Sequence, residues 1–479
     1  MQTRMDYSQA VSSDAAQQAP TLVRGVSLFD ATLLIVGGTL GSGLFLTSSD
    51  VAAATHTPWL FFLAWVAGAV VALLASLPMA ELGAMFPESG GQYIYLREAY
   101  GDFAAFLYGW MIFTINVTGS LAALAAGFAA YTGALFPVLA SEKPAASLFG
   151  HVFTIGQLVA AGALLVLTWI NIIGLRRAVW LQNVASIAKF SVVGLFLLLG
   201  FAMGHGSWAN FSQPLPGHAS AGTLAAGFGL AMIAVLWVYD GWVYITWIAG
   251  EVREPQRTIP RALLYGVASI GAIVVLLNVL YLYAMPMSSM REQTVVLAGA
   301  ANALFTPAVA HWMSALVALS CFGAAASCMM GGSRVYYAMA KDGLFFRRLS
   351  EVHPRYRTPA LSLAVQCVWS IVLVLTGRYD QLFTYVMFVS VIAYALAASS
   401  LFVLRRKLPR AARPFLCPGY PWVPALYCLI GLTWAASTLV QRPRESLAGI
   451  GIMLLGTPAY WWWRRDRLRA RTQELEGTL

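Results

Sequence analysis

From about residue 26 onward, the chain alternates long apolar runs with short polar segments. A run of about 20 apolar residues, folded as a helix, matches the thickness of a bilayer core. The pattern therefore predicts an all-α integral membrane protein with about twelve transmembrane helices. The expected spans are roughly 26–54, 58–85, 101–136, 152–175, 181–204, 223–250, 260–286, 306–341, 359–377, 380–404, 421–440 and 445–463.

The composition excludes a water-soluble fold. Hydrophobic residues make up 59% of the chain and charged residues only 10%, against roughly 45–50% and 25% in soluble domains. Residues 1–24 are polar and too weakly apolar to fold, so we expect a short disordered cytoplasmic tail rather than a signal peptide. We expect one transmembrane domain over residues 25–464 and a second cytoplasmic tail over 465–479.

The net charge of +10 raises the question of nucleic-acid binding, and the placement of the basic residues argues against it. With the N-terminus in the cytoplasm, 23 of the 30 basic residues lie on that side of the predicted spans and five on the other. This asymmetry is the positive-inside pattern of membrane proteins. We expect both termini in the cytoplasm and the protein in the plasma (inner) membrane of the cell, with no nucleic-acid partner.

Two of the predicted spans are interrupted near mid-membrane. The first contains four glycines within residues 37–43, each of which weakens a helix by about 1 kcal/mol relative to alanine. The sixth contains an acid and a glycine, Asp240 and Gly241, at a similar depth. Glycines also permit close helix packing, but packing gives no reason for two interruptions at matching depth. We therefore predict that helices 1 and 6 are discontinuous.

The two interruptions also indicate an internal repeat. They lie 198 residues apart, and the same offset carries the long third span onto the long eighth. Because each copy holds five spans, the second copy inserts upside down relative to the first. This predicts a 5+5 inverted repeat over about 26–205 and 223–404, with helices 11 and 12, about 421–463, outside it. Transporters of this design bind substrate at the midplane.

A broken helix offers main-chain groups of both polarities. The N–H groups of Ser42, Gly43 and Leu44 are suited to an α-carboxylate. The carbonyl groups that can accept from an α-ammonium are those of Thr39, Trp237 and Val238. A zwitterion fits both sets, although other small carboxylates fit the first.

The motifs around these breaks carry a family resemblance. They are Gly-Ser-Gly-Leu-Phe at 41–45, Phe-Pro-Glu-Ser-Gly-Gly-Gln-Tyr from 86, Tyr-Asp-Gly-Trp at 239–242, Gly-Glu-Val-Arg-Glu-Pro from 250 and Ser-Arg at 333–334. In this order and spacing, from about residue 25 to 405, the chain resembles the amino acid-polyamine-organocation (APC) superfamily, closest to its L-type amino acid transporter branch. The resemblance implies a LeuT-like fold, alternating access and a free amino acid as substrate.

The resemblance also assigns roles to residues. It places the carboxylate-binding motif on Gly41, Ser42 and Gly43, and the amino-group acceptors on Thr39, Trp237 and Asp240. Trp237 stands where the family has an aromatic gate, often phenylalanine. The larger ring puts a preference for large substrates in doubt. We expect a neutral amino acid, with a cationic amino acid or polyamine as the alternative.

Asp240 and Lys189 are the two charges that need explanation within the membrane. Asp240 either attracts a cationic side chain or caps the half-helix that begins near Gly241. Lys189 lies inside the fifth span, where the family resemblance implies a lysine in place of the sodium ion of coupled relatives. We predict sodium independence, with Lys189 bonded to carbonyls near Gly38 or to Ser327.

Other polar residues have more ordinary expected roles. We expect Glu81, Glu88, Glu251, Arg334 and Asp342, at or near span ends, to be solvated charges rather than gate ion pairs. Asn116 and Ser120 lie on one face of the third span, where hydrogen bonding between helices is more usual than substrate contact.

Several functional classes lack support in the sequence. There is no P-loop, no H-E-x-x-H motif and no cluster among the six histidines, so we expect no enzyme activity, no cofactor and no metal. A membrane amino acid sensor that binds without translocating remains a rival interpretation. Proton symport and exchange use the same residues, and no pattern indicates a partner subunit.

Overall fold

The computed structural model describes residues 20–41, 43–140, 142–148, 151–216, 220–376, 379–441 and 443–476. The α-helices are α2 (Leu28–Thr39), α3 (Gly43–Leu46), α4 (Ser48–Thr55), α5 (Pro58–Met85), α6 (Gln92–Tyr100), α7 (Asp102–Met111), α8 (Val117–Leu135), α9 (Ile155–Ile172), α10 (Leu175–Met203), α11 (Ala221–Val238), α12 (Tyr244–Trp247), α13 (Pro255–Ala284), α14 (Met287–Met290), α15 (Val296–Leu304), α16 (Pro307–Lys341), α17 (Ala360–Leu375), α18 (Tyr379–Lys407), α19 (Trp422–Gln441) and α20 (Pro443–Glu476). The remaining elements are the π-helix η1 (Ile112–Asn116), the 3-10 helices η2 (Pro137–Leu139), η3 (Trp208–Ser212), η4 (Ala249–Glu251) and η5 (Arg347–Ser350), and the strands β1 (Pro144–Leu148) and β2 (His151–Thr154).

The helices confirm a multi-pass membrane protein. Within the described residues, nine helical runs are long and apolar enough to cross a bilayer, and α2 and α17 are shorter apolar helices. Each of the twelve predicted spans contains helix, and α5 matches its predicted span at both ends. Helix α10, which forms the fifth predicted span, begins at Leu175 rather than near residue 181. Helix α20, which forms the twelfth, continues through the predicted C-terminal tail to Glu476.

One small departure from the all-α prediction lies between α8 and α9. There, β1 and β2 pair antiparallel as a two-stranded hairpin. The paired segment falls between two membrane spans, where the chain is not confined to helix by the bilayer.

Both predicted helix interruptions are present. Helix 1, which begins as α2, stops at Thr39 and resumes as α3 at Gly43. The amide of Thr47 donates to the carbonyl of Gly43, and that of Val51 donates to Thr47, so α3 and α4 form one half-helix. Helix 6, which begins as α11, stops at Val238 and resumes as α12 at Tyr244.

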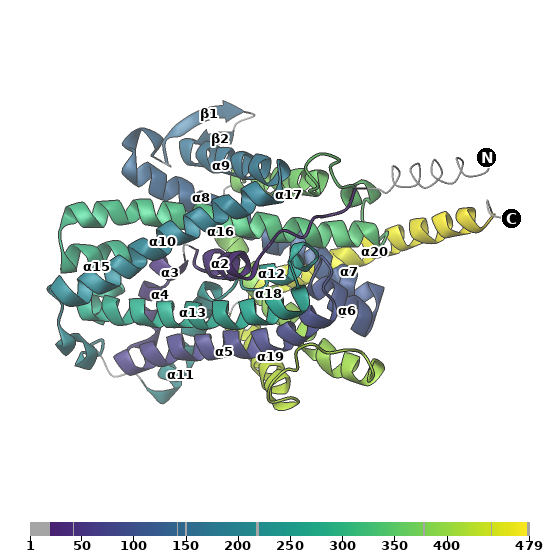
Figure 1. The fold of residues 1–479 in the computed structure, drawn as a ribbon. Helices are drawn as coiled ribbons and strands as arrows, with labels where there is room; N and C mark the ends of the chain where they lie inside the picture. The colour runs from purple at the N-terminus through teal and green to yellow at the C-terminus, as the bar shows by residue number, and fades with distance from the viewer. Residues whose placement is uncertain are drawn as a thin grey trace, which may run out of the picture.

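The packing of the bundle is duplicated in the way an inverted repeat requires. Helix α5 packs on α13, α8 on α16 and α9 on α17, each against its counterpart in the other half. Likewise α2 packs on α13 while α11 packs on α5. These are the pairings expected of two halves related by an inverted repeat. Figure 1 shows the short segments α2, α3 and α12 in the interior, with the long helices α5, α10, α13 and α16 around them.

The end of the bundle at which α2 begins and α20 ends, here called the terminal face, is closed by a main-chain clasp. Val26 and Val252 form a parallel β-bridge. The carbonyl of Glu251 accepts from the amides of Gly25 and Val26 at 2.8 and 3.0 Å, and the amide of Arg253 donates to Val26. This clasp joins the segment before α2 to the segment after α12.

Buried ion pairs lie on the same side, and they correct the expectation of solvated charges. Arg334 donates from Nε and Nη2 to the carboxylate of Glu251 at 2.8 and 3.1 Å, and the two side chains are 1% and 0% exposed. Glu81 is also fully buried and pairs with Arg405 at 2.6 Å. A solvated charge needs a helix end that faces water, and here neighbouring helices cover both carboxylates. Asp342 pairs with Arg97 at 2.6 Å, whereas Glu88 is exposed as expected.

Replacing Arg334 by methionine should lower the thermal stability strongly, because it leaves the Glu251 carboxylate buried without a partner. Breaking such a pair costs about 3–5 kcal/mol. Arg347→Met is the matched control, since Arg347 is exposed at the same face. Scanning fluorimetry on the purified variants measures the melting temperatures. Equal melting of the two variants would contradict a structural role for the pair.

Candidate functional site

The two helix interruptions cross one another at the centre of the bundle. Gly241 has a φ of +112°, a conformation that favours glycine. A Cβ atom at Gly241 would lie 2.9 Å from the carbonyl oxygen of Gly38 and 3.0 Å from the Cα of Thr39. Glycine is therefore required at position 241 for two reasons. It adopts the backbone angle, and it lets the two interrupted segments approach closely.

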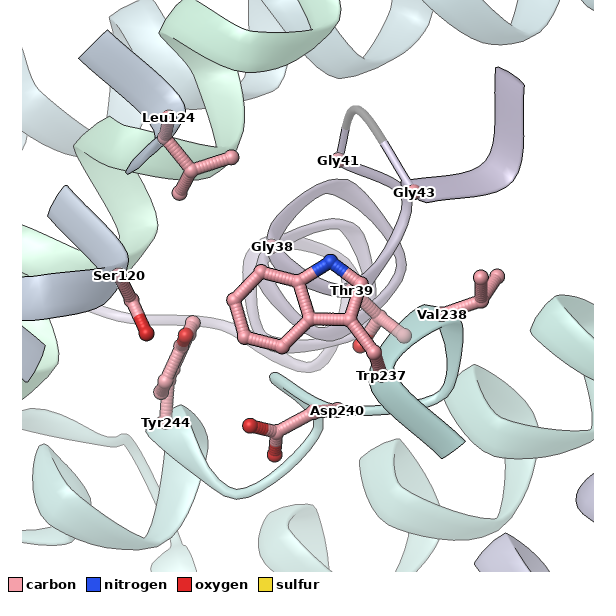
Figure 2. A pocket seen from close by; sticks show the side chains of 10 residues that line it. All are labelled: Gly38, Thr39, Gly41, Gly43, Ser120, Leu124, Trp237, Val238, Asp240 and Tyr244. Atoms are coloured by element: carbon pink, nitrogen blue, oxygen red, sulfur yellow. The ribbon is translucent and has the colours of Figure 1, made fainter. Parts of the chain in front are cut away.

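A small cavity lies at this crossing. Figure 2 shows the Trp237 indole across it, with the α2 end and Gly43 on one side and Asp240 and Tyr244 on the other. Helix α8 supplies the remaining wall. The lining residues are Gly38, Thr39, Gly41, Gly43, Ser120, Leu124, Trp237, Val238, Asp240 and Tyr244.

The position predicted as a gate, Trp237, packs directly against the first interruption. A Cβ atom at Gly43 would lie 2.8 Å from Cδ1 and 3.1 Å from Nε1 of the indole, and 3.2 Å from Val238. The indole is half-buried. Any side chain at position 43 would displace the ring, so glycine here keeps both the ring and the backbone amide close to the cavity.

The main-chain groups predicted to hold a zwitterion are distributed around this cavity. The carbonyl of Thr39 accepts from the amide of Gly41 at 2.8 Å, and the carbonyl of Trp237 accepts from the amide of Asp240 at 3.2 Å. A carbonyl oxygen has a second lone pair, so the carbonyl of Thr39 can accept a further bond from an ammonium. Gly43 begins the half-helix whose first amides were predicted to hold the carboxylate. Ser42 lies outside the described residues.

Asp240 faces the cavity with its carboxylate (Figure 2). Its Oδ1 accepts from the amide of Gly241 at 2.9 Å and from the Tyr394 hydroxyl at 3.1 Å. The first contact is not a helix cap, because the second half of helix 6 begins at Tyr244 with Val243 as its N-cap residue and no side-chain cap. Binding of a cationic group by the same carboxylate stays a prediction.

Lys189 reaches the first interruption from α10. Its side chain is 1% exposed, and Nζ donates to the carbonyls of Gly37 at 3.0 Å and Leu40 at 2.6 Å. Ser320 of α16 donates to the same Leu40 carbonyl at 2.7 Å. These bonds satisfy carbonyls that the break removes from the helix ladder, as backbone within a membrane requires.

Of the two partners predicted for Lys189, the structure confirms the carbonyls near Gly38, at Gly37 and Leu40, and not Ser327. Within the described residues the hydroxyl of Ser327 has no hydrogen-bond partner, although its side chain lies against Gly38. The hydroxyl that serves the interruption is that of Ser320, two helical turns earlier on α16. Leu44 is absent from the lining of the cavity, and the prediction that its main-chain amide binds the carboxylate stays a prediction.

Several lining residues were not assigned from the sequence. Gly38, Leu124 and Tyr244 were missed, and for Ser120 a bond between helices was preferred. That preference holds for Asn116, which donates to Ser390 at 2.6 Å, but Ser120 lines the cavity. The four-residue spacing of Ser120 and Leu124 on one face of a long helix was an available signal.

A family model described as amino acid permease matches residues 26–452. This range holds both interruptions, Lys189 and every residue of the cavity. The chain belongs to the amino acid permease family. Its members transport amino acids across membranes and are not enzymes, so membership confirms the predicted APC fold and its function as an amino acid permease.

Curated relatives of this permease are similar over most of their length. The serine/threonine exchanger SteT of Bacillus subtilis (strain 168) is 28% identical over 451 residues, covering 93% of this chain and 98% of that protein. The b(0,+)-type amino acid transporter 1 of Mus musculus is 29% identical, covering 88% and 84%. The large neutral amino acids transporter small subunit 2 of Homo sapiens is 27% identical, covering 94% and 83%. The predicted L-type relationship is therefore confirmed.

Gly43→Val in this permease should abolish amino acid uptake without loss of membrane expression, because the new side chain pushes the Trp237 ring into the cavity. Gly162→Val is the matched control, since a Cβ atom at Gly162 would meet nothing within 4 Å. Uptake of a labelled neutral amino acid into proteoliposomes measures the effect. Normal uptake by the Gly43 variant would refute the site.

Proposed function

We propose that this permease carries neutral amino acids across the cell membrane by sodium-independent exchange. It works by alternating access, with both termini in the cytoplasm. The observation that carries the proposal is the crossing of two interrupted helices beside a buried lysine. The crossing offers acceptors and amides to a zwitterion, and the lysine occupies the carbonyls that would otherwise attract a cation.

Sodium independence rests on the surroundings of Lys189. Carbonyls at the end of a half-helix are the groups that bind coupling cations in transporters of this design. Here the ammonium already bonds to Gly37 and Leu40. An ammonium group at this position repels a second cation, so a sodium site there is disfavoured.

Exchange is supported by the bacterial relative, which is named a serine/threonine exchanger. The neutral substrate class is supported by the same name and by that of the human relative, a large neutral amino acids transporter small subunit. The limited space beneath Trp237 and the apolar wall at Leu124 favour a small neutral side chain. Proton symport is the alternative coupling mode.

Proteoliposomes loaded with unlabelled serine should accumulate labelled serine equally well in sodium and in choline medium. Lys189→Met should lower this counterflow about tenfold or more, since two carbonyls lose a charged donor. Lys341→Met, at an exposed position at the end of α16, is the control. A steep sodium requirement would discard the role of Lys189. Binding without accumulation would indicate a sensor.

The carboxylate of Asp240 favours one second candidate, a cationic amino acid or polyamine. A thermal-shift screen of the twenty amino acids separates the two. We expect small neutral amino acids to stabilise the protein most and lysine and arginine to have little effect. The strongest stabilisation by lysine or arginine would replace the neutral proposal with the cationic one.

A further inference from the structure

A second cavity lies at the terminal face, away from the crossing. It forms where four segments meet. These are the segment before α2, the start of α10, the segment after η4 and the loop between η5 and α17. Each contributes one arginine to the lining, namely Arg24, Arg176, Arg253 and Arg357. We call this cavity the basic pocket.

The positive charge of the basic pocket is poorly balanced within the protein. Among the described residues, no ion pair involves Arg24, Arg176 or Arg253, and Arg357 contacts only a hydroxyl, at 3.4 Å. The one carboxylate in the lining is Asp30. Four arginines and one carboxylate in the lining leave a net positive charge that attracts an anion.

Asp30 is itself occupied by local contacts. Its Oδ2 accepts from the amide and hydroxyl of Ser27 at 2.9 and 2.7 Å, and its Oδ1 accepts from Asn183 at 2.6 Å. The first pair is the capping box of α2. The carboxylate is therefore hydrogen-bonded by the α2 start and α10, and of the pocket arginines Arg253 acts on it through its charge.

The start of α10 adds to the same attraction. Gly174 and Leu175 line the pocket, and α10 is a 29-residue helix that begins at Leu175. Its first amides and its positive dipole end favour an anion there, and phosphate is a group that helix N-termini bind well.

The other wall of the basic pocket is apolar and exposed. Trp180 lines the pocket and is 65% exposed. Further along α10, Val184, Ile187 and Leu198 are 44%, 48% and 71% exposed, so an apolar surface continues from the pocket into the membrane. A tryptophan at this depth is typical of the bilayer interface. A ligand with an anionic head and acyl chains fits both walls.

We propose that the basic pocket binds the phosphodiester headgroup of an anionic glycerophospholipid from the cytoplasmic leaflet. The arginines hold the phosphate, and the acyl chains lie along the exposed face of α10. Basic pockets between transmembrane helices on the cytoplasmic side recognise such headgroups. A free phosphate ion shares the headgroup chemistry but gains nothing from the apolar wall.

The pocket also spans the clasp of the terminal face. Arg24 directly precedes the clasp residues Gly25 and Val26, and Arg253 directly follows Val252. A headgroup held by both arginines ties the two clasp segments together. Bound lipid therefore favours the conformation closed at the terminal face. This step rests on the proposed function by alternating access.

Native mass spectrometry of delipidated protein tests the site without any transport step. We expect wild type to retain phosphatidylglycerol and to prefer it over phosphatidylcholine. Each arginine should contribute about fivefold, so R24Q/R176Q/R253Q should bind roughly one hundredfold more weakly. The charge-preserving R24K/R176K/R253K variant should keep most of the affinity.

The matched control is R177Q/R406Q/R410Q, which removes three exposed arginines at the same face that do not line the pocket. It should bind phosphatidylglycerol as wild type does. The proposal is overturned if this control loses as much affinity as the pocket variant, or if both lipids bind equally. Displacement of the lipid by inorganic phosphate at equal concentration would overturn the lipid assignment.

Discussion

Every main-chain polar group inside a bilayer needs a partner, and this constraint decides how the interrupted helices are built. Helix 1 opens at Leu40, and the freed carbonyls of Gly37 and Leu40 are taken by Lys189 and Ser320. Helix 6 opens at Gly241, whose amide is taken by Asp240. The breaks are thus stabilised from neighbouring helices, and the cavity lies where the two breaks cross.

The terminal face depends on one residue with two kinds of contact. The main-chain carbonyl of Glu251 binds the segment before α2, while its carboxylate binds Arg334 of α16. Helix 1, helix 6 and helix 8 are therefore fastened together on this side of the crossing. An opening toward this face must separate the clasp, and the basic pocket lies across the segments that would part.

Hydropathy alone determined most of the fold. The spans, the two breaks and the repeat were predictable because a bilayer allows only long apolar helices, and because departures from that rule, such as the glycines of 37–43, are conspicuous. The residues at the breaks were predictable for the same reason. The need of Lys189 for carbonyl partners near Gly38 also followed, since an ammonium within a membrane requires acceptors.

Contacts between distant segments were decided only by the tertiary structure. The sequence could not distinguish Ser320 from Ser327, because both lie on one face of α16 and only the depth of α2 selects between them. Glu81 and Glu251 looked like solvated span ends, yet neighbouring helices cover them. The local sequence pattern indicates which polar groups need a hydrogen-bonding or ionic partner. The relative placement of the packed helices decides which partner each group contacts.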